Sequence, residues 1–301
     1  MRFEHKRVST SGGDVAYVDL GEGPPVLLIH GFPTSSHLWR REIPLLSSRM
    51  RVVAPDLLGY GDSEKPAGAD LSIIAQAGYL SELLERLQIE RPAVVGHDIG
   101  GGVAQLLAMD GKAAALVVLD SICFDVWPIE GVKMIQDATE EQENLEFVES
   151  LVRLTFDMGL AKQQLDDTDI HAYTEPWRDD PSAFFRAARG IDGKGLAGRE
   201  AELAGLDIPA FVVWGEDDPF LPSELAERLG EAIPMSMVAL LPGCSHFVNE
   251  DAWQTVDQLI HEFLRLRYLG DSHGHGAEGP VPIYLRPPTP EEIAAADGDD
   301  A

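Results

Sequence analysis

The feature that most constrains the fold of this chain is a series of short apolar runs that alternate with helix-like segments. The runs are rich in branched side chains, which is typical of strands buried on both faces of a sheet. They span residues 26–30, 52–55, 93–96, 116–119 and 211–214. Between them, segments such as residues 71–87 place leucines on one helical stripe. Strands that alternate with helices predict an α/β fold, with a mostly parallel central sheet flanked by helices.

The alternation stops between residues 121 and 205, where helical segments follow one another without a clear new strand. We interpret this part as a helical cap inserted into the sheet domain. The expected domains are therefore a core of residues 1–120 and 206–269, a cap of residues 121–205, and an acidic, Pro- and Gly-rich tail of residues 270–301. Such a tail is typical of disordered or surface-lying chain, and its two histidines, His273 and His275, do not by themselves predict a metal site.

The charge balance excludes some partners. Acidic residues number 51 against 23 basic ones, which gives a formal net charge of −28. This charge repels phosphate backbones and anionic lipid surfaces, so neither nucleic acid nor a membrane is expected as a partner. The first residues lack an apolar signal segment, and no run approaches the ~18 apolar residues that span a bilayer. We expect a cytoplasmic protein that acts on a small molecule, and the sequence is compatible with a homo-oligomer.

The two cysteines, Cys123 and Cys244, are interpreted as small packing residues, because such sparse usage is unlike that of a disulfide-stapled scaffold. No motif in the chain calls for a metal, a nucleotide or a flavin. The sequence therefore predicts chemistry without a cofactor.

Residues 96–101, Gly-His-Asp-Ile-Gly-Gly, directly follow one predicted strand and directly precede a helix. Glycines at these positions permit a sharp turn that lifts the central side chain above the sheet edge, as in a nucleophile elbow. The central residue here is Asp98, a carboxylate where many such elbows carry a serine. An isolated Gly-x-Asp-x-Gly would indicate only a turn, so the prediction depends on the flanking strand and helix.

Two further polar segments end later strands, with Glu216, Asp217 and Asp218 in the first and His246 in the second. Functional groups in open parallel sheets gather beyond the carboxyl ends of the strands, so these residues are expected to meet Asp98. The chain order of nucleophile, acid and histidine is that of hydrolase triads. The local run does not distinguish among its three acids.

An earlier strand is followed by residues 30–33, His-Gly-Phe-Pro, in the place where such folds supply one backbone donor of an oxyanion hole. The amides of Phe32 and Ile99 are the expected donors, although an ordinary Gly-Pro turn explains the first segment equally well on its own. Residues 55–63, Pro-Asp-Leu-Leu-Gly-Tyr-Gly-Asp-Ser, are assigned a structural role and no catalysis.

Together these motifs resemble the aspartate-nucleophile branch of the α/β-hydrolase superfamily, which contains epoxide hydrolases, haloalkane dehalogenases and fluoroacetate dehalogenases. The resemblance covers roughly residues 2–269 and implies the α/β-hydrolase fold with a helical cap. In relatives the triad acid commonly lies three residues after the glycine that ends the strand, which favours Asp218. An aspartate suits a substrate whose reactive carbon is saturated, because Asp98 can form an ester that water activated by His246 then hydrolyses.

The choice of substrate depends on the leaving group. Epoxide hydrolases need acid groups in the cap, typically two tyrosines or a His/Tyr pair, and Tyr173 is the cap's only tyrosine, with His171 close by. Trp39 and Trp127 either bind a halide through their indole N–H groups or line an apolar pocket.

Haloalkane dehalogenases usually carry a tryptophan directly after the nucleophile, where this chain has Ile99, and Phe32 replaces their frequent asparagine. Neither Ile99 nor Gly102 supplies the arginine with which fluoroacetate dehalogenases bind a carboxylate. We therefore expect an epoxide hydrolase. The alternatives are a haloalkane or haloacid dehalogenase and, outside the enzymes, a non-catalytic hydrolase-fold protein that binds a ligand.

Overall fold

The computed structural model describes residues 3–270 and residues 281 and 282. The predicted tail, with His273 and His275, otherwise lies outside the described residues. In the described part, nine strands form one sheet in the order β1-β2-β4-β3-β5-β6-β7-β8-β9. Their bounds are β1 (Lys6–Ser9), β2 (Asp14–Leu20), β3 (Pro25–Ile29), β4 (Arg51–Pro55), β5 (Ala93–His97), β6 (Ala115–Leu119), β7 (Ala210–Gly215), β8 (Ser236–Leu241) and β9 (Val281–Pro282).

All strand pairs from β4 to β9 are parallel, whereas β1 pairs with β2, and β2 with β4, antiparallel. The predicted α/β class with a mostly parallel sheet is confirmed. The prediction missed β1 and β2. The edge strand β1 is short and largely exposed, whereas β2 carries a buried apolar run at residues 15–18 that was not recognised. The central strands β5 and β6 are buried along their whole length, as their uninterrupted apolar sequences indicated.

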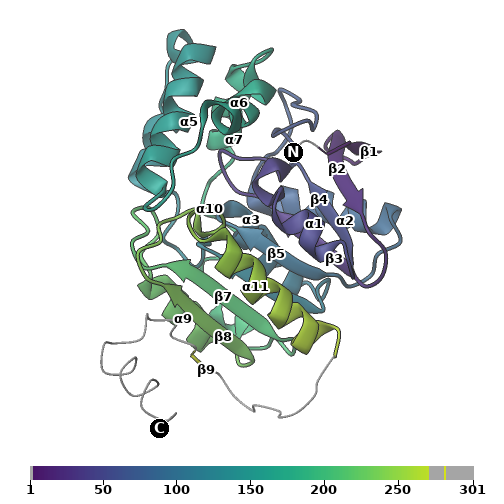
Figure 1. Cartoon of the computed structure of the whole chain (residues 1–301). Coiled ribbons are helices and arrows are strands. Elements are labelled where there is room, and N and C mark those ends of the chain that lie inside the picture. The colour runs from purple at the N-terminus through teal and green to yellow at the C-terminus, as the bar shows by residue number, and fades with distance from the viewer. Residues whose placement is uncertain (1–2, 271–280, 283–301) are drawn as a thin grey trace.

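Helices cover both faces of this sheet (Figure 1). In the figure, α11 crosses the face nearest the viewer, where α1 packs against it, and α3 packs against α2 and against β5 and β6. The core helices are α1 (Glu42–Leu46), α2 (Ile73–Arg86), α3 (Ile99–Met109), α8 (Glu200–Leu203), α9 (Glu224–Ala232), α10 (Val248–Asp251) and α11 (Trp253–Phe263), with a 3-10 turn η1 (Ser36–Trp39) and a π-helical turn η4 (Leu264–Tyr268). No described helix is long and apolar enough to cross a bilayer.

Between β6 and β7 the described chain forms helices without a new strand. They are α4 (Glu130–Gln136), α5 (Leu145–Gly159), α6 (Asp167–Thr174) and α7 (Ser182–Arg189), with short 3-10 turns η2 (Glu140–Gln142) and η3 (Glu175–Trp177), followed by α8, which packs on α3 of the core. Figure 1 shows α5, α6 and α7 gathered beyond the end of the sheet where α10 lies. These helices therefore stand over the strand ends where a catalytic elbow is expected.

Helices α1 and α11 bury two carboxyl groups near each other, Glu42 and Asp257. Neither side-chain oxygen of Glu42 has a hydrogen-bond partner among the described residues. Burial, followed by the negative charge of Asp257, raises the pKa of Glu42 well above its ordinary value. Burial also raises the pKa of Asp257 to about 6, against the opposing charge of Arg41. The folded protein therefore holds protons that the unfolded chain releases at lower pH.

This pair predicts a pH-dependent stability. The stability present at low pH is lost as pH rises through about 6, because only the folded state must then bury unpaired charge. Asp257→Asn should therefore raise the melting temperature at pH 8 by roughly 2–4 °C, the shift that about 1 kcal/mol gives in a large domain, and change it little at pH 4.5. Thermal unfolding followed by circular dichroism checks this, with the exposed Glu231→Gln on α9 as control. An equal shift at both pH values would contradict it.

Candidate active site

Asp98 occupies a sharp turn between β5 and α3, with φ of 52° and ψ of −121°. A positive φ at a non-glycine residue costs free energy, so the surrounding chain must enforce it. Tight packing does so: a Cβ at Gly96 would lie 2.2 Å from the Gly100 oxygen, and one at Gly100 would lie 2.3 Å from the His30 oxygen. The glycines of the elbow are therefore required by close backbone contact, and they bring Asp98 to the edge of the sheet.

The two carboxylate oxygens of Asp98 have different surroundings. The Phe32 amide donates a hydrogen bond of 2.9 Å to Oδ2, and the Ile99 amide also hydrogen-bonds to this carboxyl group. The other oxygen, Oδ1, is buried and has no partner among the described residues. One oxygen thus accepts the Phe32 amide, as expected, while the second is unpaired among the described residues.

His30 fixes the loop that carries Phe32. Its Nδ1–H donates to the Gly31 carbonyl at 2.9 Å, which leaves Nε2 to accept the amide of Leu57 at 2.9 Å. The histidine is fully buried, and burial lowers its pKa, so it stays neutral and keeps this tautomer. Its function is to join the oxyanion loop to the segment that follows β4.

His246 and Asp218 form the second half of the site. His246 Nδ1–H donates to Asp218 Oδ2 at 2.9 Å, and both side chains are buried. The other Asp218 oxygen accepts the amides of Phe220 at 2.8 Å and Leu221 at 3.0 Å, which fixes the carboxylate. Glu216 and Asp217 are exposed, as are acids on ordinary solvated turns. The structure thus places Asp218, and neither of its two neighbours, against His246.

Charge and burial compete in setting the pKa values of the two reacting groups. Burial lowers the pKa of His246, but the charge and hydrogen bond of Asp218, together with the charge of Asp98, outweigh it and raise the net value. Burial raises the pKa of Asp98 to about 6, although His246 and the amides of Phe32 and Ile99 favour the carboxylate. At neutral pH these shifts favour an ionised Asp98 beside a histidine that can take up a proton.

These shifts predict the pH dependence of activity. Attack requires ionised Asp98, so kcat/KM should fall about tenfold per pH unit below about 6. The acid limb of kcat should lie at higher pH, because ester hydrolysis requires neutral His246, whose pKa is raised above its ordinary value. Initial rates from pH 4.5 to 9 on any substrate that is turned over measure both limbs. An acid limb near pH 4, as for an exposed aspartate, would contradict the prediction for kcat/KM.

Two buried residues of the site were missed by sequence analysis. His97 Nε2 lies 2.9 Å from the His246 carbonyl, which can only accept, so this nitrogen carries the proton. Burial lowers the pKa of His97 well below its ordinary value, and the neutral ring packs at 4.8 Å from the ring of His246. The sequence signal that could have identified His97 is its position directly before Asp98. We assign it to holding the backbone of His246.

The second missed residue is Asp120, at the end of β6, with φ of 40°. Its Oδ1 accepts the Gly215 amide at 2.8 Å and so links the ends of β6 and β7, while Oδ2 has no partner among the described residues. Burial, followed by the charge of Asp218, raises the pKa of Asp120 well above its ordinary value. Asp120 therefore links the ends of two strands beside the Asp218–His246 pair.

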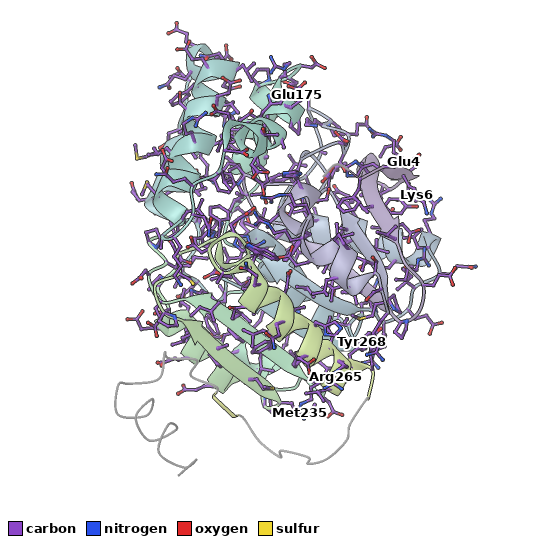
Figure 2. The ribbon with its side chains drawn as sticks, viewed as in Figure 1. Glu4, Lys6, Glu175, Met235, Arg265 and Tyr268 are labelled. Carbon is purple, nitrogen blue, oxygen red and sulfur yellow. The ribbon has the colours of Figure 1, made fainter. Side chains whose placement is uncertain are left out.

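The cap residues suggested by the sequence lie in different surroundings. Tyr173, on α6, is buried, and its hydroxyl lies 3.4 Å from Glu250 Oε1. His171 lies on the outer side of α6, where its side chain is 59% exposed and Nε2 is 3.5 Å from Glu175, a residue at the outer end of the cap (Figure 2). A separation of two residues turns side chains to different helix faces. This position argues against the leaving-group role considered for His171.

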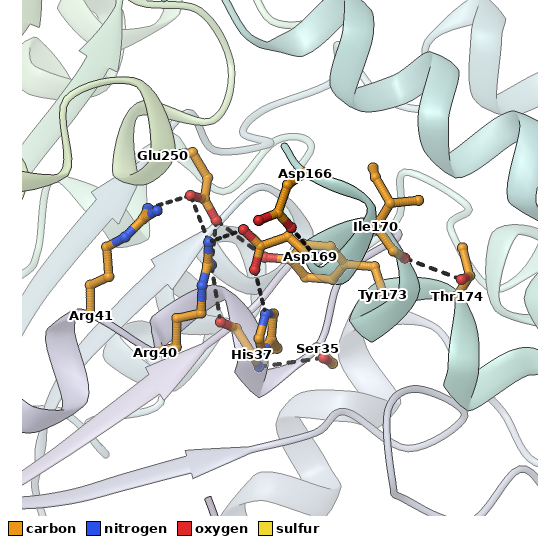
Figure 3. A network of polar contacts seen from close by, with 10 residues as sticks. All are labelled: Ser35, His37, Arg40, Arg41, Asp166, Asp169, Ile170, Tyr173, Thr174 and Glu250. Atoms are coloured by element: carbon orange, nitrogen blue, oxygen red, sulfur yellow. Dashed lines mark hydrogen bonds and ion pairs between the residues drawn. The ribbon is translucent and has the colours of Figure 1, made fainter. Parts of the chain in front are cut away.

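Tyr173 belongs to a network of charges that joins the cap to the core (Figure 3). Arg40 binds Glu250 of α10 and, through Nη2, Asp169 of α6 at 3.1 Å. Arg41 also pairs with Glu250. Since α10 begins two residues after His246, the network ties helix α6 to the segment that carries His246.

The two tryptophans considered as halide ligands, Trp39 and Trp127, are both buried. Neither indole N–H has a hydrogen-bond partner in the part of the chain that the structure describes. The same holds for the hydroxyl of Tyr60, which sequence analysis assigned only to a structural turn. These three buried donors are thus unpaired within the described part of the chain.

A sharp turn that presents a buried carboxylate, a histidine hydrogen-bonded to a second acid, and amides near the first carboxylate resemble the site of a hydrolase. The chain belongs to the alpha/beta hydrolase family, whose model matches residues 26–259. The predicted superfamily and hydrolase class are confirmed.

Individual relatives agree with this assignment. Haloalkane dehalogenase 2 of Mycobacterium tuberculosis is 31% identical over 272 residues, which cover 86% of this chain and 94% of that protein. A 2-hydroxy-6-oxo-2,4-heptadienoate hydrolase of Pseudomonas putida is 24% identical, and the match covers 86% of this chain and 95% of that protein. The crystal structure of an alpha/beta hydrolase fold protein from Burkholderia ambifaria superposes with a TM-score of 0.79 at 32% identity, over 85% of this chain and 97% of that one.

Proposed function

We propose that this hydrolase acts on a small organic substrate at a saturated carbon, through an ester formed on Asp98, and that its preferred substrate is an epoxide. The observation that carries the proposal is the buried Asp98 carboxylate, with Oδ2 held by the Phe32 amide and Oδ1 without a partner among the described residues. A carboxylate nucleophile suits displacement at a carbon that offers no carbonyl to attack.

The proposed reaction has two steps. Asp98 Oδ1 first attacks the ring carbon, which forms an ester and opens the carbon–oxygen bond. His246 then removes a proton from water, which attacks the ester carbonyl on Asp98, and the amides of Phe32 and Ile99 hold the resulting oxyanion. Asp218 stabilises the imidazolium through its 2.9 Å hydrogen bond. The ring oxygen keeps the electron pair of the broken bond and gains a proton, which the water supplies through His246 over the whole cycle. The products are a diol and the free Asp98 carboxylate.

The preference for an epoxide is supported by the side chains beside the nucleophile. Ile99 and Phe32 carry no side-chain N–H, so only their amides face Asp98, and the Phe32 amide is already occupied by its carboxylate. A haloacid would need a nearby cation for its carboxylate. Position 102 supplies none, because it is a glycine whose Cβ would already lie 2.7 Å from the Ile122 side chain.

A second candidate is carbon–halogen hydrolysis by the same aspartyl ester. It is favoured by the 31% identity to haloalkane dehalogenase 2 of Mycobacterium tuberculosis. Trp39 and Trp127 also keep buried indole N–H groups without partners in the described part of the chain, and N–H donors of this kind can stabilise a departing halide.

Turnover of a mixed panel tests both candidates. Styrene oxide, 1-bromobutane and chloroacetate are incubated with the enzyme, and diol and halide are measured, with Asp98→Asn as the inactive control. Diol from the epoxide supports the proposal, and halide release without diol supports the second candidate. Binding of these compounds without any Asp98-dependent product would overturn both in favour of a ligand-binding protein.

A further inference from the structure

We infer that Tyr60 is a catalytic residue that donates its phenolic proton to the oxygen leaving the attacked carbon. The inference rests on the proposed function, and it assigns chemistry to a segment that the sequence explained as a turn. Hydrogen bonds and close packing fix the backbone of this segment. Asp56 accepts the amides of Ser36 and Asp62, both at 2.7 Å, and a Cβ at Gly61 would lie 2.2 Å from the Asp56 carboxyl carbon. The backbone of Tyr60 is therefore fixed on both sides.

The Tyr60 ring lies where the oxyanion loop meets the cap. It is fully buried and meets the Phe32 ring edge-on at 6.4 Å between centroids and the Trp177 ring at 5.8 Å. Phe32 supplies the amide that holds Asp98 Oδ2, and Trp177 belongs to η3 of the cap. The His30 ring completes the contacts at 5.4 Å. Tyr60 thus contacts both Phe32, whose amide binds Asp98, and Trp177 of the cap.

The hydroxyl of Tyr60 is the unusual part of this arrangement. It is buried and has no hydrogen-bond partner among the described residues, although buried hydroxyls are normally paired. Asp98 Oδ1, the oxygen available for attack, is unpaired as well. Burial and the charge of Asp98 raise the pKa of Tyr60, and ester formation removes that charge in the same step in which the proton leaves. A neutral phenol near the nucleophile can give up a proton, whereas an indole N–H can only form a hydrogen bond.

The chemistry balances with the groups present. As Asp98 forms its bond to the ring carbon, the carbon–oxygen bond breaks and its electron pair goes to oxygen, which takes the proton of Tyr60. The resulting tyrosinate recovers a proton when water hydrolyses the ester, since water supplies hydroxide to the carbonyl and a proton, through His246, to the site. Epoxide and water give a diol, and every side chain returns to its initial state.

Tyr173 is the other tyrosine that could serve, but its hydroxyl has a different environment. It lies 3.4 Å from the Glu250 carboxylate, within the charged network of Arg40 and Asp169 (Figure 3). Because the Tyr173 hydroxyl proton points to the Glu250 carboxylate, it is not available to a substrate. The unpaired hydroxyl of Tyr60 is therefore the better donor.

The test is Tyr60→Phe, made in the background of His246→Gln so that ester formation is observed alone. With styrene oxide, rapid quenching and mass spectrometry should show the Asp98 adduct forming roughly 10²-fold or more slowly, the usual effect of losing a positioned acid. With 1-bromobutane, whose halide needs no proton, any adduct formation should change much less. The melting temperature should stay equal or rise, because an unpaired buried hydroxyl is removed.

The matched control is Tyr79→Phe, which removes a phenol whose hydroxyl donates to the Asp70 carbonyl outside the site. An adduct that forms equally fast with and without the Tyr60 hydroxyl overturns the inference and leaves the proposed function intact. A large loss in Tyr173→Phe, with none in Tyr60→Phe, also overturns it and returns the role to Tyr173. If no epoxide yields an adduct on Asp98 at all, the proposed epoxide reaction fails, and the inference fails with it.

Discussion

Replacing His246 with glutamine is expected to stop turnover and to leave the enzyme trapped as an ester on Asp98. Attack needs only the free Oδ1 of Asp98, whereas hydrolysis needs a base that removes a proton from water. The steady-state rate should therefore fall by roughly 10²–10⁴-fold, the usual contribution of a general base, while the first step survives. Intact-protein mass spectrometry with styrene oxide should show one added substrate mass, and peptide mapping should place it on Asp98.

His171→Gln is the matched control for this variant, because it makes the same change at an exposed histidine of the cap and should leave turnover unchanged. An adduct on any residue other than Asp98 would contradict the assignment of the nucleophile. Undiminished turnover in His246→Gln would show that another group activates water.

The second large effect is expected at the triad acid. Asp218→Asn should lower kcat by about 10⁴, the scale on which the orienting carboxylate acts in the serine-protease triad. The amide cannot balance the charge of the imidazolium that forms when His246 takes a proton, and it can present the wrong group to Nδ1–H. Asp217→Asn, one residue away and exposed, should change kcat less than twofold, since its side chain lies outside the buried pair and about 0.4 kcal/mol corresponds to that factor.

Steady-state kinetics of the two purified variants, with circular dichroism to verify their fold, measure this difference. Equal losses would mean that the acidic turn acts through its total charge. A small loss in Asp218→Asn alone would require another carboxylate to support His246, and Asp120, buried near Asp218 at the end of β6, would then be the group to replace.

The strands that could be predicted from sequence are those buried on both faces. An uninterrupted apolar run has few other places in a soluble fold, so β3 to β8 follow directly from such runs or from their position after the cap. The edge strand β1 could not be recognised this way, because solvent permits polar residues such as Lys6, which pairs with Asp19 of β2 at 2.8 Å. Its neighbour β2 is paired on both sides and was overlooked although residues 15–18 form a buried apolar run. Edge position is a property of the assembled sheet.

The site residues also differ in how far local sequence predicted them. Local spacing was sufficient for Asp98, because a glycine-lined turn between a strand and a helix is a local backbone structure. It was not sufficient to distinguish Asp218 from Glu216 and Asp217. That choice came from family resemblance, and the structure places Asp218 in a 2.9 Å contact with His246.

By itself, then, the sequence determined the alternation of strands and helices, the inserted helical segment and the elbow that presents Asp98. Only the tertiary structure decided which polar atoms are paired. The Tyr173 hydroxyl meets a carboxylate 77 positions along the chain, and His97 supports a carbonyl 149 positions away, while the Tyr60 hydroxyl has no partner in the described chain. The physical reason is the sequence distance over which each interaction acts. Backbone conformation follows from neighbouring residues, but burial and hydrogen bonding depend on groups that only folding brings together.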